Sequence, residues 1–144
     1  MTDAMVVARK LAAMREHLDR VRRRRPERLD DLRTDVDRQD ALAMSLLVVV
    51  QESLDLAFHL VTDEGWGMPA SYAESFEILA QHGVLDAELA GALAAAARLR
   101  NRIAHGYASV DIEKLWAELP AGIAAFDAYA AALARWTLRS DGAP

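Results

Sequence analysis

One short stretch, two thirds of the way along the chain, combines side chains that could act on a phosphodiester: Arg100-Asn101-Arg102-Ile103-Ala104-His105-Gly106-Tyr107. Arginine can hold a phosphate through a planar fork of donors, and histidine can exchange a proton near neutral pH. An amide and a phenol lie beside them. No other stretch of the 144 residues gathers so many groups of this kind. The stretch is therefore the first candidate for a catalytic site.

The stretch ends an alanine-rich segment, which predicts a helix capped by Asp86 and ending near His105-Gly106. On such a helix Asn101 and His105 share a face, whereas Arg100 and His105 lie about 140° apart around the axis. The long arginine side chain, a loosening of the helix before Gly106, or a second copy from a partner subunit could bring both groups to one phosphate. This geometry is compatible with a site shared by two subunits.

Both basic stretches of the chain also have a structural interpretation. Cations in the last turn of a helix are favourable by about 0.3–1 kcal/mol, so Arg100 and His105 could simply stabilise their helix. The run from Arg22 to Arg25, just before Pro26, could bind a nucleic acid or an acidic partner. For this run a solvated helix end is the favoured interpretation.

A polar line formed by Gln51, Asp55 and His59 follows one face of a long apolar segment at i, i+4 and i+8. The segment, from about Asp35 to Thr62, is apolar around nearly its whole circumference. Such a helix is buried by its neighbours or by a second subunit, and the apolar excess favours an oligomer. The polar line could border an active cleft, with Asp55 orienting His59 or an arginine from elsewhere, or it could be only a solvated stripe.

Composition predicts an all-α protein. Apolar residues make up 53% of the chain and aromatic residues only 6%, and alanine and leucine far outnumber the strongly β-forming types. The length fits one domain, expected over residues 1–139, with a frayed tail at 140–144. The pattern indicates an up-and-down bundle of about five helices, starting near residues 3, 35, 71, 86 and 111, with Pro120 opening or kinking the last segment.

Aromatic side chains mark a loop and the helix after it. The loop runs from Asp63 to Pro69 and contains Trp66, which could stack a base but more commonly would anchor its own loop. Ser71 begins a Ser-x-x-Glu capping box, after which Tyr72 and the other apolar residues are expected to face the core. His82 is interpreted as a structural residue at the end of that helix.

Charge and residue types narrow the function classes. The chain has no cysteine, and its four histidines are too scattered to form a ligand pair on one helical turn, so no metal or other cofactor is expected. The net charge of -5 argues against a general nucleic-acid coat, and any RNA contact must be local. The longest apolar run, from Ala41 to Val50, is short of the roughly 20 residues that span a bilayer. A signal-peptide pattern is absent from the N-terminal segment, and we expect a cytoplasmic protein with no membrane partner.

At Arg100, Asn101, His105 and Tyr107 the sequence resembles the HEPN superfamily, whose signature is an arginine, a polar residue, three further residues and then His-x-Tyr. It is most similar to the HepT branch, the toxin half of HEPN/MNT toxin–antitoxin pairs. Two further features resemble that branch: the polar line Gln51, Asp55 and His59, and the segment Pro69-Ala70-Ser71-Tyr72-Ala73-Glu74-Ser75-Phe76. The resemblance covers residues 5 to 135.

The resemblance implies a helical bundle and a homodimer whose two motifs face each other across a cleft. It also implies metal-independent endoribonuclease activity. His105 would act as general base or acid on the RNA 2′-hydroxyl and the leaving oxygen, while Arg100 stabilises charge at the phosphorus. Asn101 would orient the imidazole or the phosphate. Arg102 would add positive potential or remain solvated.

The resemblance further implies a partner. A cognate MNT-type nucleotidyltransferase antitoxin would neutralise the toxin, and in this branch it can transfer AMP to the motif tyrosine, here Tyr107. Tyr107 would otherwise position RNA near the cleft, and an attached AMP would add bulk and negative charge where a phosphate must bind. The alternative function is a non-catalytic helical binding subunit that partners a nucleotidyltransferase.

Overall fold

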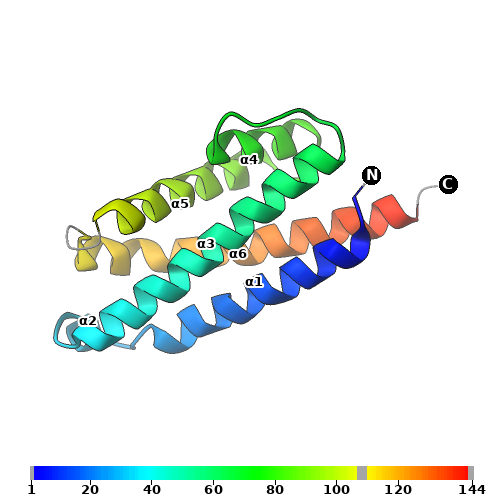
Figure 1. The fold of residues 1–144 in the computed structure, drawn as a ribbon. Coiled ribbons are helices and arrows are strands. Elements are labelled where there is room, and N and C mark those ends of the chain that lie inside the picture. Colours follow the sequence, from blue (N-terminus) through cyan, green and yellow to red (C-terminus); the bar gives the residue numbers. More distant parts are fainter. Residues whose placement is uncertain (1, 107–109, 143–144) are drawn as a thin grey trace.

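The computed structural model describes residues 2–106 and 110–142, and these form six α-helices without any strand (Figure 1). Four long helices run up and down along a common direction, which confirms the all-α class and the bundle architecture. The helices are α1 Ala4–Arg24, α2 Leu29–Arg33, α3 Val36–Asp63, α4 Tyr72–Gln81, α5 Ala87–Gly106 and α6 Ile112–Asp141.

Short polar side chains cap the helices where the sequence predicts them. Asp35 accepts a hydrogen bond from the Arg38 amide at 3.0 Å, and Ser71 accepts one from the Glu74 amide at 3.1 Å. The side chains of Asp86 and Asp111 cap α5 and α6 in the same way. Each cap satisfies backbone N–H groups that the first helical turn leaves without a partner. The starts of α3 to α6 are therefore set by local chemistry.

The helix count and two boundaries differ from expectation. The connection after Pro26 contains the short helix α2, because Leu32 is completely buried and Arg33 pairs with Glu113 of α6 at 2.8 Å. Pro120 lies inside α6 and opens no new segment. Its missing N–H costs one helical hydrogen bond, at an exposed position of the helix. The helix α6 also continues to Asp141, into the segment expected to fray.

The apolar circumference of α3 is explained largely within one chain. This helix packs against α1, α2, α4 and α5, and side chains on several of its sides, such as Leu46, Val50 and Leu56, are at most 3% exposed. By length and composition α3 could cross a membrane, but 56% of the apolar window is buried inside the bundle, as in a core helix. Two apolar side chains of α3 remain exposed, Val36 at 65% and Met44 at 58%.

Trp66 anchors the loop between α3 and α4. Its ring stacks on His82 with centroids 4.1 Å apart and meets Trp136 of α6 edge to face at 6.0 Å. These contacts fasten the loop to the end of α4 and to the last turns of α6. The structural interpretations of Trp66 and His82 are thus confirmed, since one face of each ring is covered by the other.

The arginine run at the end of α1 fastens that helix to its neighbours. Arg22 pairs with Asp19 at 2.8 Å and with Asp127 of α6. Arg24 donates to the Ala41 carbonyl and the Ser45 hydroxyl of α3, and the Arg25 guanidinium lies 4.2 Å from the centre of the Trp116 ring. The run is therefore more than a solvated helix end, because three of its four arginines contact other helices.

Candidate active site

The helix α5 carries the candidate motif and stays regular through Gly106. Its buried side chains, including Leu93, Ala97 and Ile103, face the bundle, and His105 is exposed. The helix does not loosen before Gly106, which removes one of the ways in which Arg100 and His105 could converge. Five residues of regular helix separate the two side chains by about 140° around the axis and about 7.5 Å along it.

Arg100 is held by amide side chains. Its Nε donates to Gln51 Oε1 of α3 at 3.1 Å, and its Nη1 donates to Asn101 Oδ1 at 3.2 Å. Gln51 in turn donates from Nε2 to Asp55 Oδ1 at 2.9 Å. Among the described residues no carboxylate forms an ion pair with Arg100. The guanidinium is therefore fixed in direction while its positive charge stays uncompensated.

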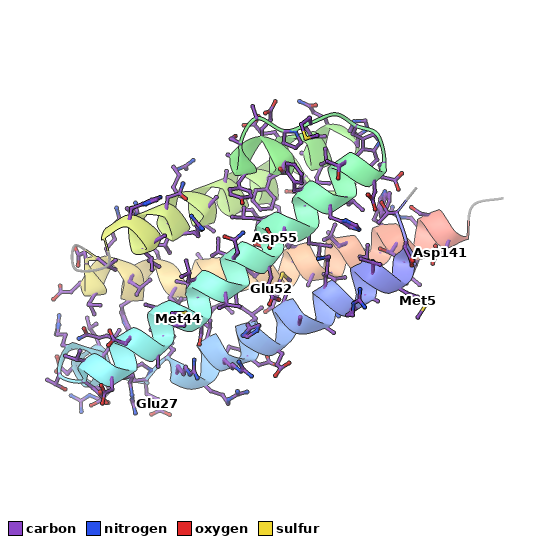
Figure 2. The ribbon with its side chains drawn as sticks, in the orientation of Figure 1. Met5, Glu27, Met44, Glu52, Asp55 and Asp141 are labelled. Carbon is purple, nitrogen blue, oxygen red and sulfur yellow. The ribbon has the colours of Figure 1, made fainter. Side chains whose placement is uncertain are left out.

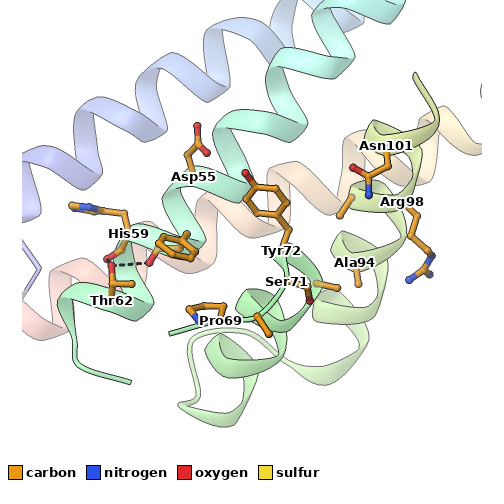
Figure 3. Close-up of a pocket in the computed structure, with 13 residues that line it drawn as sticks. Asp55, His59, Thr62, Pro69, Ser71, Tyr72, Ala94, Arg98 and Asn101 are labelled. Atoms are coloured by element: carbon orange, nitrogen blue, oxygen red, sulfur yellow. Dashed lines mark hydrogen bonds between the residues drawn. The ribbon is translucent and has the colours of Figure 1, made fainter. Parts of the chain in front are cut away.

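The polar line of α3 divides into two parts. Asp55 reaches an arginine through Gln51, which is one of the two roles left open by the sequence. It does not orient His59, whose Nε2 instead lies 3.1 Å from Asp63 Oδ2 in a contact without hydrogen-bond geometry. In Figure 3 the imidazole of His59 points away from Tyr72 and Asn101. Gln51 and Asp55 thus belong with Arg100, whereas His59 does not.

A pocket of about 740 Å³ lies between α3, the start of α4 and α5 (Figure 3). Residues 69–73, part of the segment that resembles the HepT branch, line this pocket together with residues of α5, the helix that carries the motif. The side chains of Asp55, His59 and Asn101 lie in its wall. Its full lining is Asp55, Phe58, His59, Thr62, Pro69, Ala70, Ser71, Tyr72, Ala73, Ala94, Ala97, Arg98 and Asn101.

His105 and Arg102 lie one turn apart on α5 but have different neighbours. His105 continues the face of Asn101 and Arg98, since it follows them by four and seven residues, and its imidazole has no partner among the described residues. Arg102 faces α6, where its Nη2 is 3.9 Å from Glu118 Oε2. The fifth motif side chain, Tyr107, lies outside the described residues.

Two pocket residues were missed or misplaced by sequence reasoning. Tyr72 was expected in the core, but it is 39% exposed, and its ring stands between α3 and α5 (Figure 3). As the first residue of α4 it faces the pocket, whereas Phe76 one turn later is buried as expected. Arg98 was not considered, although its spacing of three residues from Asn101 and seven from His105 places it on the same helical face.

No group of three or more His, Cys, Asp or Glu side chains that could hold a metal ion occurs in residues 2–106 and 110–142. The ionisable side chains of the site are instead single groups on separate turns. Asp55 is bound to an amide and not to another acid. The functional groups of the site are thus guanidinium, imidazole, amide and phenol groups.

Comparison with known proteins shows the family of the chain. Residues 14–133 match the family model described as "Ribonuclease HepT-like". A curated relative, the tRNA nuclease HepT of Aphanizomenon flos-aquae, is 25% identical over 109 residues, which cover 76% of this chain and 74% of the relative.

Two solved structures share the fold. A tri-AMPylated HEPN toxin of Shewanella oneidensis in complex with MNT antitoxin has a TM-score of 0.82 at 21% identity, covering 92% of this chain and 98% of that chain. The cytosolic protein of unknown function YutE from Bacillus subtilis has a TM-score of 0.79 at 17% identity, covering 99% of this chain and 94% of that chain. Because the family model spans most of the sequence, including the motif from Arg100 to Tyr107, the chain belongs to the HepT-like ribonuclease family.

Proposed function

We propose that this protein is the toxin of a type II toxin–antitoxin pair and that it cuts RNA at a cleft formed by two copies of its Arg100-x4-His105 motif. The observation that carries the proposal is the setting of Arg100, whose guanidinium is fixed by the amides of Gln51 and Asn101 and neutralised by no described acid. A guanidinium held in this way can bind a phosphate, which arginine contacts through two parallel hydrogen bonds. The similarity to a tRNA nuclease supports RNA as the substrate class.

The reaction needs only proton transfer and charge stabilisation. The 2′-oxygen of one ribose attacks the adjacent phosphorus and the bond to the 5′-oxygen breaks, which leaves a 2′,3′-cyclic phosphate and a 5′-hydroxyl. One His105 imidazole accepts the 2′-hydroxyl proton, and the protonated imidazole of the other copy donates to the leaving oxygen. Arg100 stabilises the charge that develops on the phosphoryl oxygens. We propose that this chemistry proceeds without a metal.

A second copy completes the site. Within one chain the regular helix places Arg100 and His105 about 140° apart around its axis, which supports a site in which a second copy brings the two groups to one phosphate. The exposed Met44 of α3 lies two turns before Gln51 on the same stripe, which provides apolar surface beside the polar site (Figure 2). We therefore propose a homodimer in which the motif of one copy faces that of the other. A sedimentation mass equal to one chain at micromolar concentration would contradict it.

The nuclease proposal is tested by incubating purified protein with RNA in EDTA. The wild-type chain is expected to cut the RNA and to leave cyclic phosphate ends. His105→Ala and Arg100→Ala are expected to leave it intact. Arg23→Ala is a matched control, because Arg23 is an exposed arginine at the end of α1 and far from the motif in sequence. Intact RNA with the wild-type chain would refute the nuclease proposal and leave the alternative, a non-catalytic subunit that binds a nucleotidyltransferase.

We propose an MNT-type nucleotidyltransferase as the antitoxin, with Tyr107 as the residue to which it can transfer AMP. The structural similarity to a tri-AMPylated HEPN toxin in complex with MNT antitoxin supports this proposal. In the transfer, the phenol oxygen of Tyr107 would attack the α-phosphorus of ATP and release pyrophosphate. The intact mass of the chain co-expressed with a neighbouring nucleotidyltransferase should increase by whole AMP units, and Tyr107→Phe should abolish the increase. An unchanged wild-type mass would count against the modification.

A further inference from the structure

We infer that the pocket between α3, α4 and α5, called the Tyr72 pocket below, binds one nucleobase of the RNA, next to the phosphate that Arg100 holds. This inference rests on the proposed function, because it assigns the pocket to the same substrate. It adds a base-binding subsite to a site that has so far been described only by its catalytic groups. The subsite would make cleavage depend on the identity of a base.

The size and walls of the Tyr72 pocket suit a base. Its volume of about 740 Å³ lies within the range of small-ligand pockets, which are mostly apolar and carry a few polar groups. Phe58, Pro69, Ala94 and Ala97 form the apolar walls. A flat aromatic base could enter such a space with its polar edge directed to the mouth.

Tyr72 supplies a surface for stacking. Its ring is 39% exposed, it lines the pocket, and its hydroxyl has no hydrogen-bond partner among the described residues. A tyrosine that served only the core would be buried or would bond through its hydroxyl, as Tyr129 does at 2.8 Å from the Ser53 carbonyl. Proteins that read single-stranded RNA stack its bases on aromatic side chains of this kind. Trp66 does not compete for this role, because it is stacked on His82.

Asn101 connects the pocket to the phosphate site. It lines the pocket, and its Oδ1 accepts the hydrogen bond from Arg100 Nη1. In Figure 3 its amide extends from α5 toward Tyr72. Asn101 therefore links the pocket that Tyr72 lines to the arginine proposed to hold the phosphate, so one nucleotide could contact both.

The rim of the pocket carries groups that could recognise a base edge and the backbone beside it. The Asp55 carboxylate and the Ser71 hydroxyl can accept hydrogen bonds from exocyclic amines. Arg98 is exposed and has no partner among the described residues, so its guanidinium can follow the next phosphate. In Figure 3 it points away from Tyr72, toward the outside of the pocket. Charged and polar groups at the mouth favour a nucleotide over an apolar protein segment.

The test measures binding without cleavage. Four fluorescent 2′-O-methyl RNA homopolymers, of A, C, G and U, cannot be cut through the 2′-oxygen and can be titrated with the intact protein. Tyr72→Leu keeps an apolar side chain but removes the ring, and Ala94→Leu narrows the pocket from the α5 side. Tyr72→Phe keeps the ring. Ala95→Leu is the matched control, because Ala95 is exposed on the neighbouring position and lines the groove toward α6 instead.

The wild-type protein is expected to prefer one of the four homopolymers. Tyr72→Leu and Ala94→Leu should weaken that preferred binding about tenfold and reduce the differences among the four, because stacking on an aromatic ring contributes of that order for each base. Tyr72→Phe and Ala95→Leu should stay within about twofold of wild type. Thermal melting of all four variants verifies that each is folded.

Two results of the binding and sedimentation experiments would overturn the inference, and a third comes from cleavage. One is an unchanged affinity and base preference in both Tyr72→Leu and Ala94→Leu. The other is a lower sedimentation mass in both variants, which would assign the pocket to the interface between copies. Failure of the nuclease proposal gives a different pattern, in which methylated RNA binds with a Tyr72-dependent preference but ordinary RNA is not cut. Conversely, ordinary RNA cut by Tyr72→Leu with wild-type site preference would refute the subsite and leave the nuclease standing.

Discussion

Two helix ends in this protein are rich in arginine, and they differ in what surrounds the cations. At the end of α1, Arg22 pairs with two carboxylates and Arg25 lies over the ring of Trp116. Near the end of α5, Arg100 donates to the amides of Gln51 and Asn101 and pairs with no acid among the described residues. The first end uses its charges to hold helices together. The second end holds its arginine in place and leaves the charge available to a ligand.

The difference shows that arginine density in a sequence does not identify a phosphate site. Cations are favourable in the last turn of a helix, which contains Arg22, Arg23 and Arg24 in α1 but only His105 in α5, so Arg100 does not owe its place to this rule. What separates them is the nature of the nearest partner on another helix. An acid neutralises the guanidinium, whereas an amide oxygen orients it at little electrostatic cost.

The largest expected effect separates the two ends directly. Arg100→Gln should lower the rate of RNA cleavage by about 10²–10³-fold, as loss of one group that stabilises transition-state charge does elsewhere. Arg22→Gln should leave cleavage unchanged and lower the free energy of unfolding by less than about 1 kcal/mol, because its ion pairs are exposed. Cleavage assays and denaturant titrations on both variants test this. Comparable losses of activity in both would contradict the comparison.

Much of the bundle follows from local sequence signals. The caps at Asp35, Ser71, Asp86 and Asp111 are confirmed, because capping depends on a few neighbouring residues. The short helix α2 was missed, because burial of Leu32 depends on contacts with distant parts of the chain. A helix of five residues carries too little periodicity to be predicted.

The site was predicted unevenly for a similar reason. The spacing of Gln51 and Asp55 on one helix is visible in the sequence, but their link to Arg100 requires α3 and α5 to pack together. Spacing alone did not separate His59, whose contact with Asp63 on the same helix removes it from the Arg100 network. Tyr72 was assigned to the core because it is apolar, and only the packed helices show that it faces a pocket.

The second prediction concerns a variant that gives Arg100 an acidic partner, like the partners of Arg22 at the end of α1. Gln51→Glu places a carboxylate beside the Arg100 Nε and should produce an ion pair like those at the end of α1. We expect RNA cleavage to fall about tenfold, because the phosphate must then compete with an acid for the guanidinium, a difference of about 1.4 kcal/mol. Gln51→Ala, which frees the arginine without neutralising it, should reduce cleavage less. Equal losses in the two variants would show that charge at position 51 is unimportant.

The third prediction tests the structural role of the α1 end. Arg25→Gln removes the cation from the face of Trp116 and should lower the free energy of unfolding by about 0.5–1 kcal/mol. Arg23→Gln is the control, since Arg23 is exposed at the same helix end, and its stability should not change measurably. Urea titration gives both values. A larger loss in Arg23→Gln than in Arg25→Gln would refute the assignment of these contacts.

The smallest expected effect concerns Glu52 of α3, a carboxyl group that has no arginine partner among the described residues. Glu52 lies beside Gln51 in sequence, and its Oε1 is 3.5 Å from Nε2 of His17 in α1. Its Oε2 is buried and accepts no hydrogen bond. Burial raises the pKa of Glu52 above its ordinary value, assisted by Asp55 and Glu16 and opposed by His17 and Lys10. The ionised form is therefore disfavoured in the folded protein.

The sign of the pH dependence follows from that shift. A carboxyl whose pKa is raised on folding binds more protons in the folded state, so its contribution to stability is present below its ordinary pKa of 4.5 and is lost as pH rises through the folded value. At about pH 7, Glu52→Gln should therefore raise the free energy of unfolding, by no more than about 0.5 kcal/mol because solvent reaches the carboxyl group. Near about pH 3.5 it should have no effect, because the carboxyl is already neutral there. Thermal melts at both pH values, with Glu77→Gln at an exposed position of α4 as control, test this. A loss of stability in Glu52→Gln at about pH 7 would show that the Glu52 carboxylate, unlike Arg100, is compensated by its neighbours.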